Sequence, residues 1–157
     1  MWERPQADAI MKVKKAVVQA PTLALYDPNC DVVVSADSSA HSLGAVLLQN
    51  NRPVEFIAKS LTDTQQRYSQ LEKELLAILF AAKRFRYCLF GREKILVETD
   101  HQPLIELMAK LISKLSPRLA QMRLELLSYP VLLELKHKPG TDIILADCFI
   151  THMPTGC

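Results

Sequence analysis

Four acidic residues lie in four separate segments of this chain, and they constrain its fold more than any other feature. Asp37 and Asp100 end two strand-like runs, while Glu74 and Asp147 lie in segments with helical periodicity. In each case the local pattern points the carboxylate toward the protein interior. A buried carboxylate is destabilising unless it is neutralised, hydrogen-bonded or bound to a metal. A fold that brings the four together therefore needs divalent cations between them.

The periodicity of apolar residues predicts a mixed α/β domain. Strands are expected over residues 31–37, 42–49, 52–59, 93–100 and 131–137, the first three as an antiparallel meander with a turn at Asn50-Asn51. Helices are expected over residues 6–20, 103–111, 117–128 and 142–151, with one long helix between Thr62 and Gly91. Gly44 interrupts the second strand, which marks either a bulge or a close approach to the backbone.

Helix geometry separates the candidate acids from ordinary ones. An α-helix turns about 100° per residue, so Glu74 lies roughly 60° from the centre of the apolar stripe of the long helix. Glu72 lies about 100° away, and Lys73 lies near the opposite side. Glu74 is therefore the glutamate expected to face the sheet. The same reasoning places Asp147 on the inward face of the last helix.

The chemistry of these acids favours a hard divalent cation. Asp37 and Asp100 close strands, and the carboxyl ends of strands are where α/β sheets bind ligands. Oxygen ligands suit Mg²⁺ or Mn²⁺ and not zinc. Two such ions about 4 Å apart activate a water and stabilise the leaving oxygen of a phosphodiester. His137, ten residues before Asp147, is placed to move a proton at such a site.

Composition sets broader limits. The chain has 157 residues, 49% of them hydrophobic, enough for one domain, and its net charge of +2 permits nucleic-acid contact without requiring it. Its four cysteines form no C-x-x-C pair, which argues against zinc. No apolar run reaches the length of a membrane span, and we expect no signal sequence. We expect an intracellular protein, cytoplasmic or nuclear and not secreted, without a membrane partner.

Short motifs occur in a fixed order along the chain. They are Ser35-Ala36-Asp37-Ser38-Ser39, Gly44-Ala45-Val46-Leu47-Leu48-Gln49, Tyr68-Ser69, Glu72-Lys73-Glu74-Leu75-Leu76-Ala77-Ile78, Phe85-Arg86-Tyr87, Thr99-Asp100-His101, Lys138-Pro139-Gly140 and Ala146-Asp147. In combination they resemble the ribonuclease H domain of reverse transcriptases from gypsy-class long-terminal-repeat retrotransposons. The resemblance runs from about Trp2 to Asp147.

This resemblance implies a ribonuclease H-like α/β fold, in which three antiparallel and then two parallel strands form a five-stranded mixed sheet flanked by helices. It implies hydrolysis of the RNA strand of an RNA–DNA hybrid with two Mg²⁺ ions, for which Mn²⁺ can substitute. By motif, Asp37, Glu74, Asp100 and Asp147 would bind the metals, and His137 would assist. The residues expected to contact nucleic acid are Ser38, Ser39, Gly44, His101 and Arg86.

The resemblance also divides the chain. Residues 1–28 would form the connection from an upstream reverse-transcriptase polymerase domain, residues 29–152 the ribonuclease H-like domain, and residues 153–157 a tail. The chain contains no Tyr-x-Asp-Asp signature, so polymerase activity would belong to a larger parent protein.

Two other functions compete with the nuclease. One is a catalytically inactive or domesticated scaffold that binds hybrid. Some reverse transcriptases contain ribonuclease H-like connection domains that have lost their acids, whereas this chain keeps all four, which favours an enzyme. The other is a transposase or integrase core that would use Asp37, Asp100 and Glu134. Glu134 lies in an expected strand, whereas the integrase glutamate lies on a helix, so this alternative is disfavoured.

Overall fold

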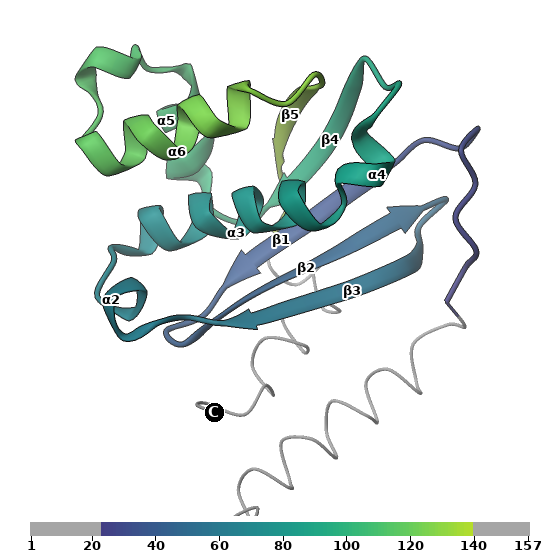
Figure 1. Ribbon diagram of the computed structural model, residues 1–157, viewed down its shortest axis with the longest axis horizontal. Coiled ribbons are helices and arrows are strands. Elements are labelled where there is room, and N and C mark those ends of the chain that lie inside the picture. The colour runs from purple at the N-terminus through teal and green to yellow at the C-terminus, as the bar shows by residue number, and fades with distance from the viewer. Residues whose placement is uncertain (1–22, 140–157) are drawn as a thin grey trace, which may run out of the picture.

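A mixed sheet of five strands organises residues 23–139, the part of the chain that the computed structural model describes. The strand order is β3-β2-β1-β4-β5 (Figure 1). The strands are β1 (Val33–Ser38), β2 (Ser42–Gln49), β3 (Arg52–Ser60), β4 (Lys94–Thr99) and β5 (Leu132–His137). The first three pair antiparallel, and β4 and β5 run parallel to β1. The predicted fold class is therefore confirmed.

Local sequence explains the β2–β3 hairpin. Asn50 and Asn51 have positive φ angles of 53° and 59°. A two-residue hairpin turn with both central residues in this left-handed region matches the twist of the flanking strands, and asparagine tolerates the conformation. The irregularity in β2 falls between Leu47 and Leu48. The bulge considered for Gly44 is therefore wrong, because Gly44 pairs regularly with Asp37.

The single long helix expected between Thr62 and Gly91 is wrong, because three helices replace it. They are α2 (Asp63–Gln66), α3 (Gln70–Arg84) and α4 (Arg86–Leu89). Ser69 caps α3, since its side chain accepts a hydrogen bond from the Glu72 backbone and Glu72 bonds back to the Ser69 backbone. This capping box starts a new helix at a place where the spacing of apolar residues alone predicts that one helix continues. Phe85 interrupts the far end, since its ψ of 16° leaves the helical range.

The helices that come after β4 agree closely with the prediction. They are α5 (Gln102–Ala109), the 3₁₀ turn η1 (Ile112–Lys114) and α6 (Pro117–Leu127). Ser116 caps α6 through the Leu119 backbone, and Pro117 occupies the first turn, where its missing N–H costs nothing.

Helix α3 builds the core. It packs on β1 and β2 and alongside α6, so the helices gather over one face of the sheet (Figure 1). Phe85, Leu75 and Leu47 have no exposed surface. Lys73 departs from prediction, because it is 7% exposed rather than on the solvent side. The β1–β2 turn covers that side of the helix, and the Lys73 ammonium donates to the Ala40 carbonyl at 3.3 Å.

Two predicted helices, residues 6–20 and 142–151, lie outside the described residues. Within residues 23–139, no helix combines the length and the apolar character needed to cross a membrane.

The capping box predicts a measurable contribution to stability. Ser69→Ala should lower the free energy of unfolding by about 1 kcal/mol, because the first turn of α3 loses a side-chain acceptor. Urea denaturation followed by circular dichroism measures this change. Ser113→Ala, at an exposed position in η1, is the control and should change stability by less than about 0.5 kcal/mol. Equal effects in the two variants would contradict the role of the cap.

Candidate metal centre

The parallel pairing of β1 with β4 brings two of the predicted acids together. Ser35 lies opposite Glu98 in this ladder. Two residues further along each chain come Asp37, still within β1, and Asp100, just beyond the end of β4. Because paired strands lie about 5 Å apart, this register sets the two aspartates side by side at the carboxyl end of β4.

Helix α3 supplies the third acid. Glu74 lies in its second turn and is 3% exposed, and Asp37 is 7% exposed. One carboxylate oxygen from each of Asp37, Glu74 and Asp100 lies within 4.8 Å of the others. Asp100 is the most exposed of the three. We call these three residues the acidic cluster. It lies where α3 packs on β1, the strand that pairs antiparallel with β2 and parallel with β4.

The two oxygens of Glu74 have different surroundings. Oε1 accepts hydrogen bonds from Ser38 Oγ at 2.7 Å and from Gln70 Nε2 at 2.6 Å. Oε2 is buried and has no hydrogen-bond partner within the described part of the chain. Burial raises the pKa of Glu74 to about 7; the Ser38 and Gln70 hydrogen bonds oppose this rise, and the negative charge of Asp100 adds to it.

The cluster has the donor set that a hard divalent cation requires. Carboxylate oxygens at this mutual spacing suit Mg²⁺ or Mn²⁺. A buried polar atom without a partner is destabilising, and a cation at Glu74 Oε2 would remove that cost. These residues therefore fit a divalent metal.

The other two predicted participants have different positions. His137 is the last residue of β5, exposed and paired with Thr99, the residue before Asp100. It thus lies on the neighbouring strand at the same end of the sheet as the acidic cluster. Asp147 lies outside the described residues.

The predicted nucleic-acid contacts surround the cluster unevenly. Gly44 lies opposite Asp37, and Ser39 bonds with Ser42 in the β1–β2 turn. His101 precedes α5, and its backbone N–H donates to Thr99. Arg86 is separate, since it lies on α4, beyond the far end of α3, with its guanidinium 5.6 Å from the Phe90 ring centroid. Their roles in binding nucleic acid stay predictions.

Sequence reasoning did not single out Gln70 or assign the Ser38 hydroxyl to Glu74. Gln70 is four residues before Glu74, and residues at that spacing are neighbours on a helix surface. The four-residue spacing therefore predicts the contact between Gln70 and Glu74. The Ser38 contact spans 36 residues and depends on how α3 packs on β1, so no local pattern reveals it.

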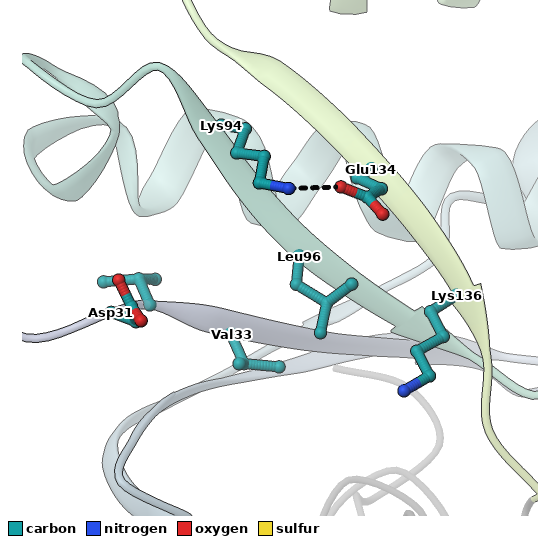
Figure 2. Close-up of a pocket in the computed structure, with 7 residues that line it drawn as sticks. Asp31, Val33, Lys94, Leu96, Glu134 and Lys136 are labelled. Carbon is teal, nitrogen blue, oxygen red and sulfur yellow. Dashed lines mark hydrogen bonds and ion pairs between the residues drawn. The ribbon is translucent and has the colours of Figure 1, made fainter.

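The structure excludes Glu134 from the acidic cluster. Glu134 pairs with Leu96, four residues before Asp100, which places it on the order of 13 Å from Asp100 along the strand direction. Figure 2 shows Glu134 in an ion pair with Lys94, 3.0 Å between charged atoms. Both line a groove of about 410 Å³ with Leu96 and Lys136 (Figure 2). The integrase-like set of Asp37, Asp100 and Glu134 is therefore wrong.

Comparison with known families decides the relationship. Residues 2–97 match the family model of the RNase H-like domain found in reverse transcriptase. The chain belongs to this family. The match includes Asp37 and Glu74 and ends shortly before Asp100.

Relatives of this RNase H-like domain include polyproteins of mobile elements. The chain is 45% identical over 97 residues to the retrovirus-related Pol polyprotein from transposon 297 of Drosophila melanogaster, covering 62% of the chain and 9% of that protein. It is 33% identical over 104 residues to the Pol polyprotein from transposon gypsy of the same species, covering 66% and 10%. It is 30% identical over 152 residues to the transposon Tf2-3 polyprotein of Schizosaccharomyces pombe, covering 93% and 11%. The chain thus spans about a tenth of these relatives.

Solved structures show the same fold. The native protease-reverse transcriptase of prototype foamy virus superposes with a TM-score of 0.64 at 17% identity, covering 87% of this chain and 19% of that one. The foamy viral protease-reverse transcriptase in complex with RNA/DNA hybrid gives 0.62 at 17% identity, covering 87% and 19%. RNase H1 from the archaeon Halobacterium salinarum gives 0.62 at 17% identity, covering 76% and 93%.

The raised pKa of Glu74 predicts a pH dependence of stability in the metal-free domain. The folded state holds the Glu74 proton more tightly than the unfolded chain, so the free energy of unfolding falls as pH rises from 4.5 to about 7. The full contribution, about 3 kcal/mol, is present below pH 4.5 and lost above about 7. Urea denaturation in EDTA at several pH values measures it.

Glu74→Gln should remove this part of the pH dependence, because the amide stays neutral throughout. Glu106→Gln, at an exposed position, should leave the slope as it is in the unmodified protein. A Glu74→Gln variant with an unchanged slope would show that Glu74 titrates normally.

Proposed function

We propose that this chain is an endoribonuclease that hydrolyses the RNA strand of RNA–DNA hybrids as the ribonuclease H domain of a retrotransposon reverse transcriptase. The acidic cluster is the observation on which the proposal rests. Three carboxylates from β1, α3 and the end of β4 lie within 4.8 Å of one another, and Glu74 Oε2 is buried without a partner among residues 23–139. Like charges at this distance are stable together only when a proton or a cation compensates them.

In this proposal Asp37, Glu74 and Asp100 hold two Mg²⁺ ions, or Mn²⁺ in their place, together with Asp147. Bound Mg²⁺ supplies Lewis acidity, which lowers the pKa of a water and stabilises charge on the leaving oxygen of the phosphodiester. The buried side chains of Asp37 and Glu74 fix the geometry of the site. His137, exposed at the end of β5, moves a proton between the site and solvent.

The proposed substrate is an RNA–DNA hybrid. The foamy viral relative has been solved with such a hybrid, which supports this substrate for the shared fold. Proteins distinguish RNA from DNA by contacts with the 2′-hydroxyls that line the wide minor groove. We assign this contact to the β1–β2 hairpin near Ser39 and Gly44, and DNA phosphate contact to Arg86.

We propose that residues 29–152 form the nuclease domain, residues 1–28 the connection to an upstream polymerase domain, and residues 153–157 a tail. The relatives are Pol polyproteins of about ten times the matched length, which supports a polymerase partner in the parent protein. The proposed location is cytoplasmic or nuclear. Free thiols at Cys30 and Cys88 agree with a reducing compartment.

Cleavage of a labelled hybrid tests the proposal directly. The 157-residue chain should cut the RNA strand of an RNA–DNA duplex in Mg²⁺ and leave DNA–DNA duplex intact. Asp37→Asn should reduce cleavage at least about a hundredfold, since loss of a metal ligand removes several kcal/mol of transition-state stabilisation. Asp31→Asn, an exposed aspartate before β1, is the control. Absence of cleavage by the unmodified chain in both Mg²⁺ and Mn²⁺ would refute the nuclease.

Thermal unfolding separates a nuclease from an inactive scaffold. Ligands that bind only the folded state stabilise it, by about 2.7 kcal/mol at a hundredfold excess over Kd. Mg²⁺ should therefore raise the unfolding temperature of the unmodified chain and of Asp31→Asn, but not that of Asp37→Asn. An unmodified chain that Mg²⁺ does not stabilise would favour the scaffold.

A further inference from the structure

Three side chains beside the acidic cluster form a closed set of hydrogen bonds. Ser38 Oγ and Gln70 Nε2 both donate to Glu74 Oε1, and Gln70 Nε2 also lies 3.1 Å from Ser38 Oγ, which accepts from it. Ser38 ends β1, whereas Gln70 and Glu74 belong to the first two turns of α3. The set therefore joins the strand of one acid to the helix of another.

This arrangement fixes one oxygen of a carboxylate and leaves the other free. Two donors at 2.6–2.7 Å occupy Glu74 Oε1, while buried Oε2 has no hydrogen-bond partner within residues 23–139. A carboxylate held in this way cannot rotate freely about its terminal torsion. Such restraint is what a metal ligand needs, because partners of the ligating group set its orientation.

We propose that Ser38 and Gln70 are positioning residues that hold Glu74 so that Oε2 is presented to the divalent cation. We call the pair the Glu74 clamp. Ser38 follows Asp37 directly, so the clamp also ties the Glu74 rotamer to the backbone that bears the neighbouring acid. This inference rests on the metal-dependent nuclease proposed above. It assigns to Ser38 and Gln70 a role in metal affinity through Glu74, and for Ser38 this role replaces the nucleic-acid contact expected from the sequence.

The alternative is that these hydrogen bonds only compensate the burial of a glutamate. If the bonds only compensate burial, their loss changes the free energy of unfolding and leaves metal affinity unchanged. A positioning role changes metal affinity in a protein that is still folded. Metal binding therefore separates the two, and folding stability by itself does not.

The experiment measures Mn²⁺ binding by electron paramagnetic resonance on the full chain at neutral pH. Ser38→Ala and Gln70→Met should each raise the Mn²⁺ Kd about tenfold, as loss of an outer partner of a metal ligand does. The double variant should lose less than the product of the two single effects, because both donors serve the same oxygen. Ser38→Thr, which keeps the hydroxyl, should restore affinity.

The chain offers matched controls. Ser35 is a buried serine on the same strand whose hydroxyl has no hydrogen-bond partner among the described residues, and Gln66 bonds to His41 and Leu61 rather than to an acid. Ser35→Ala and Gln66→Met should keep the unmodified Kd. In hybrid cleavage, Ser38→Ala and Gln70→Met should need about tenfold more Mg²⁺ for half-maximal rate. Their rates at saturating Mg²⁺ should recover to within a few-fold.

Each result has a distinct meaning. Folded Ser38→Ala and Gln70→Met proteins with unchanged Mn²⁺ Kd and unchanged Mg²⁺ requirement would overturn the clamp and leave the nuclease intact. A chain that binds Mn²⁺ and shows the clamp effect without cutting hybrid would overturn the nuclease alone. An unmodified chain that binds no Mn²⁺ would overturn both.

Discussion

The constraint on which the structure depends is the burial of carboxylates beside one another. Asp37 and Glu74 are almost completely buried, and Asp100 lies within 4.8 Å of both. Charges of one sign do not share such a volume without compensation. Burial raises the pKa of Glu74 to about 7 and the negative charge of Asp100 adds to the rise, so a proton on Glu74 provides this compensation in the metal-free domain below that pH. In the proposed nuclease a divalent cation takes the place of that proton.

The sheet is what makes this proximity possible. Antiparallel β1–β2 pairing and parallel β1–β4 pairing meet on β1, so Asp37 lies at the switch between them. Helix α3 then crosses this strand and brings Glu74 to the same end. Stability and function are opposed here, because the core that buries Phe85 and Leu75 also buries Glu74 Oε2, which has no hydrogen-bond partner among residues 23–139. Such sites are where a fold exchanges stability for binding.

The fold was predictable where local rules act alone. The turn at Asn50-Asn51 and the proline that opens α6 follow from backbone geometry, and both occur as expected. The long helix was mispredicted because apolar spacing continues through Tyr68, while the Ser69 cap acts on the backbone and breaks the helix. Lys73 was misplaced for a different reason. Its exposure depends on the β1–β2 turn, a segment 33 residues away that covers the helix.

Local sequence patterns are enough to identify the residues that can hold a cation: acids that end strands or face inward on helices, with Glu74 preferred over Glu72 by its angle on the helix. They also predict the succession of strands and helices along the chain, because hydrophobic periodicity and capping are local. Three facts emerge only in the folded chain: Asp37, Glu74 and Asp100 meet, Glu134 stays apart, and Ser38 and Gln70 hold one oxygen of Glu74. Those facts depend on strand register and helix packing, in which the energy of many distant contacts selects a single arrangement.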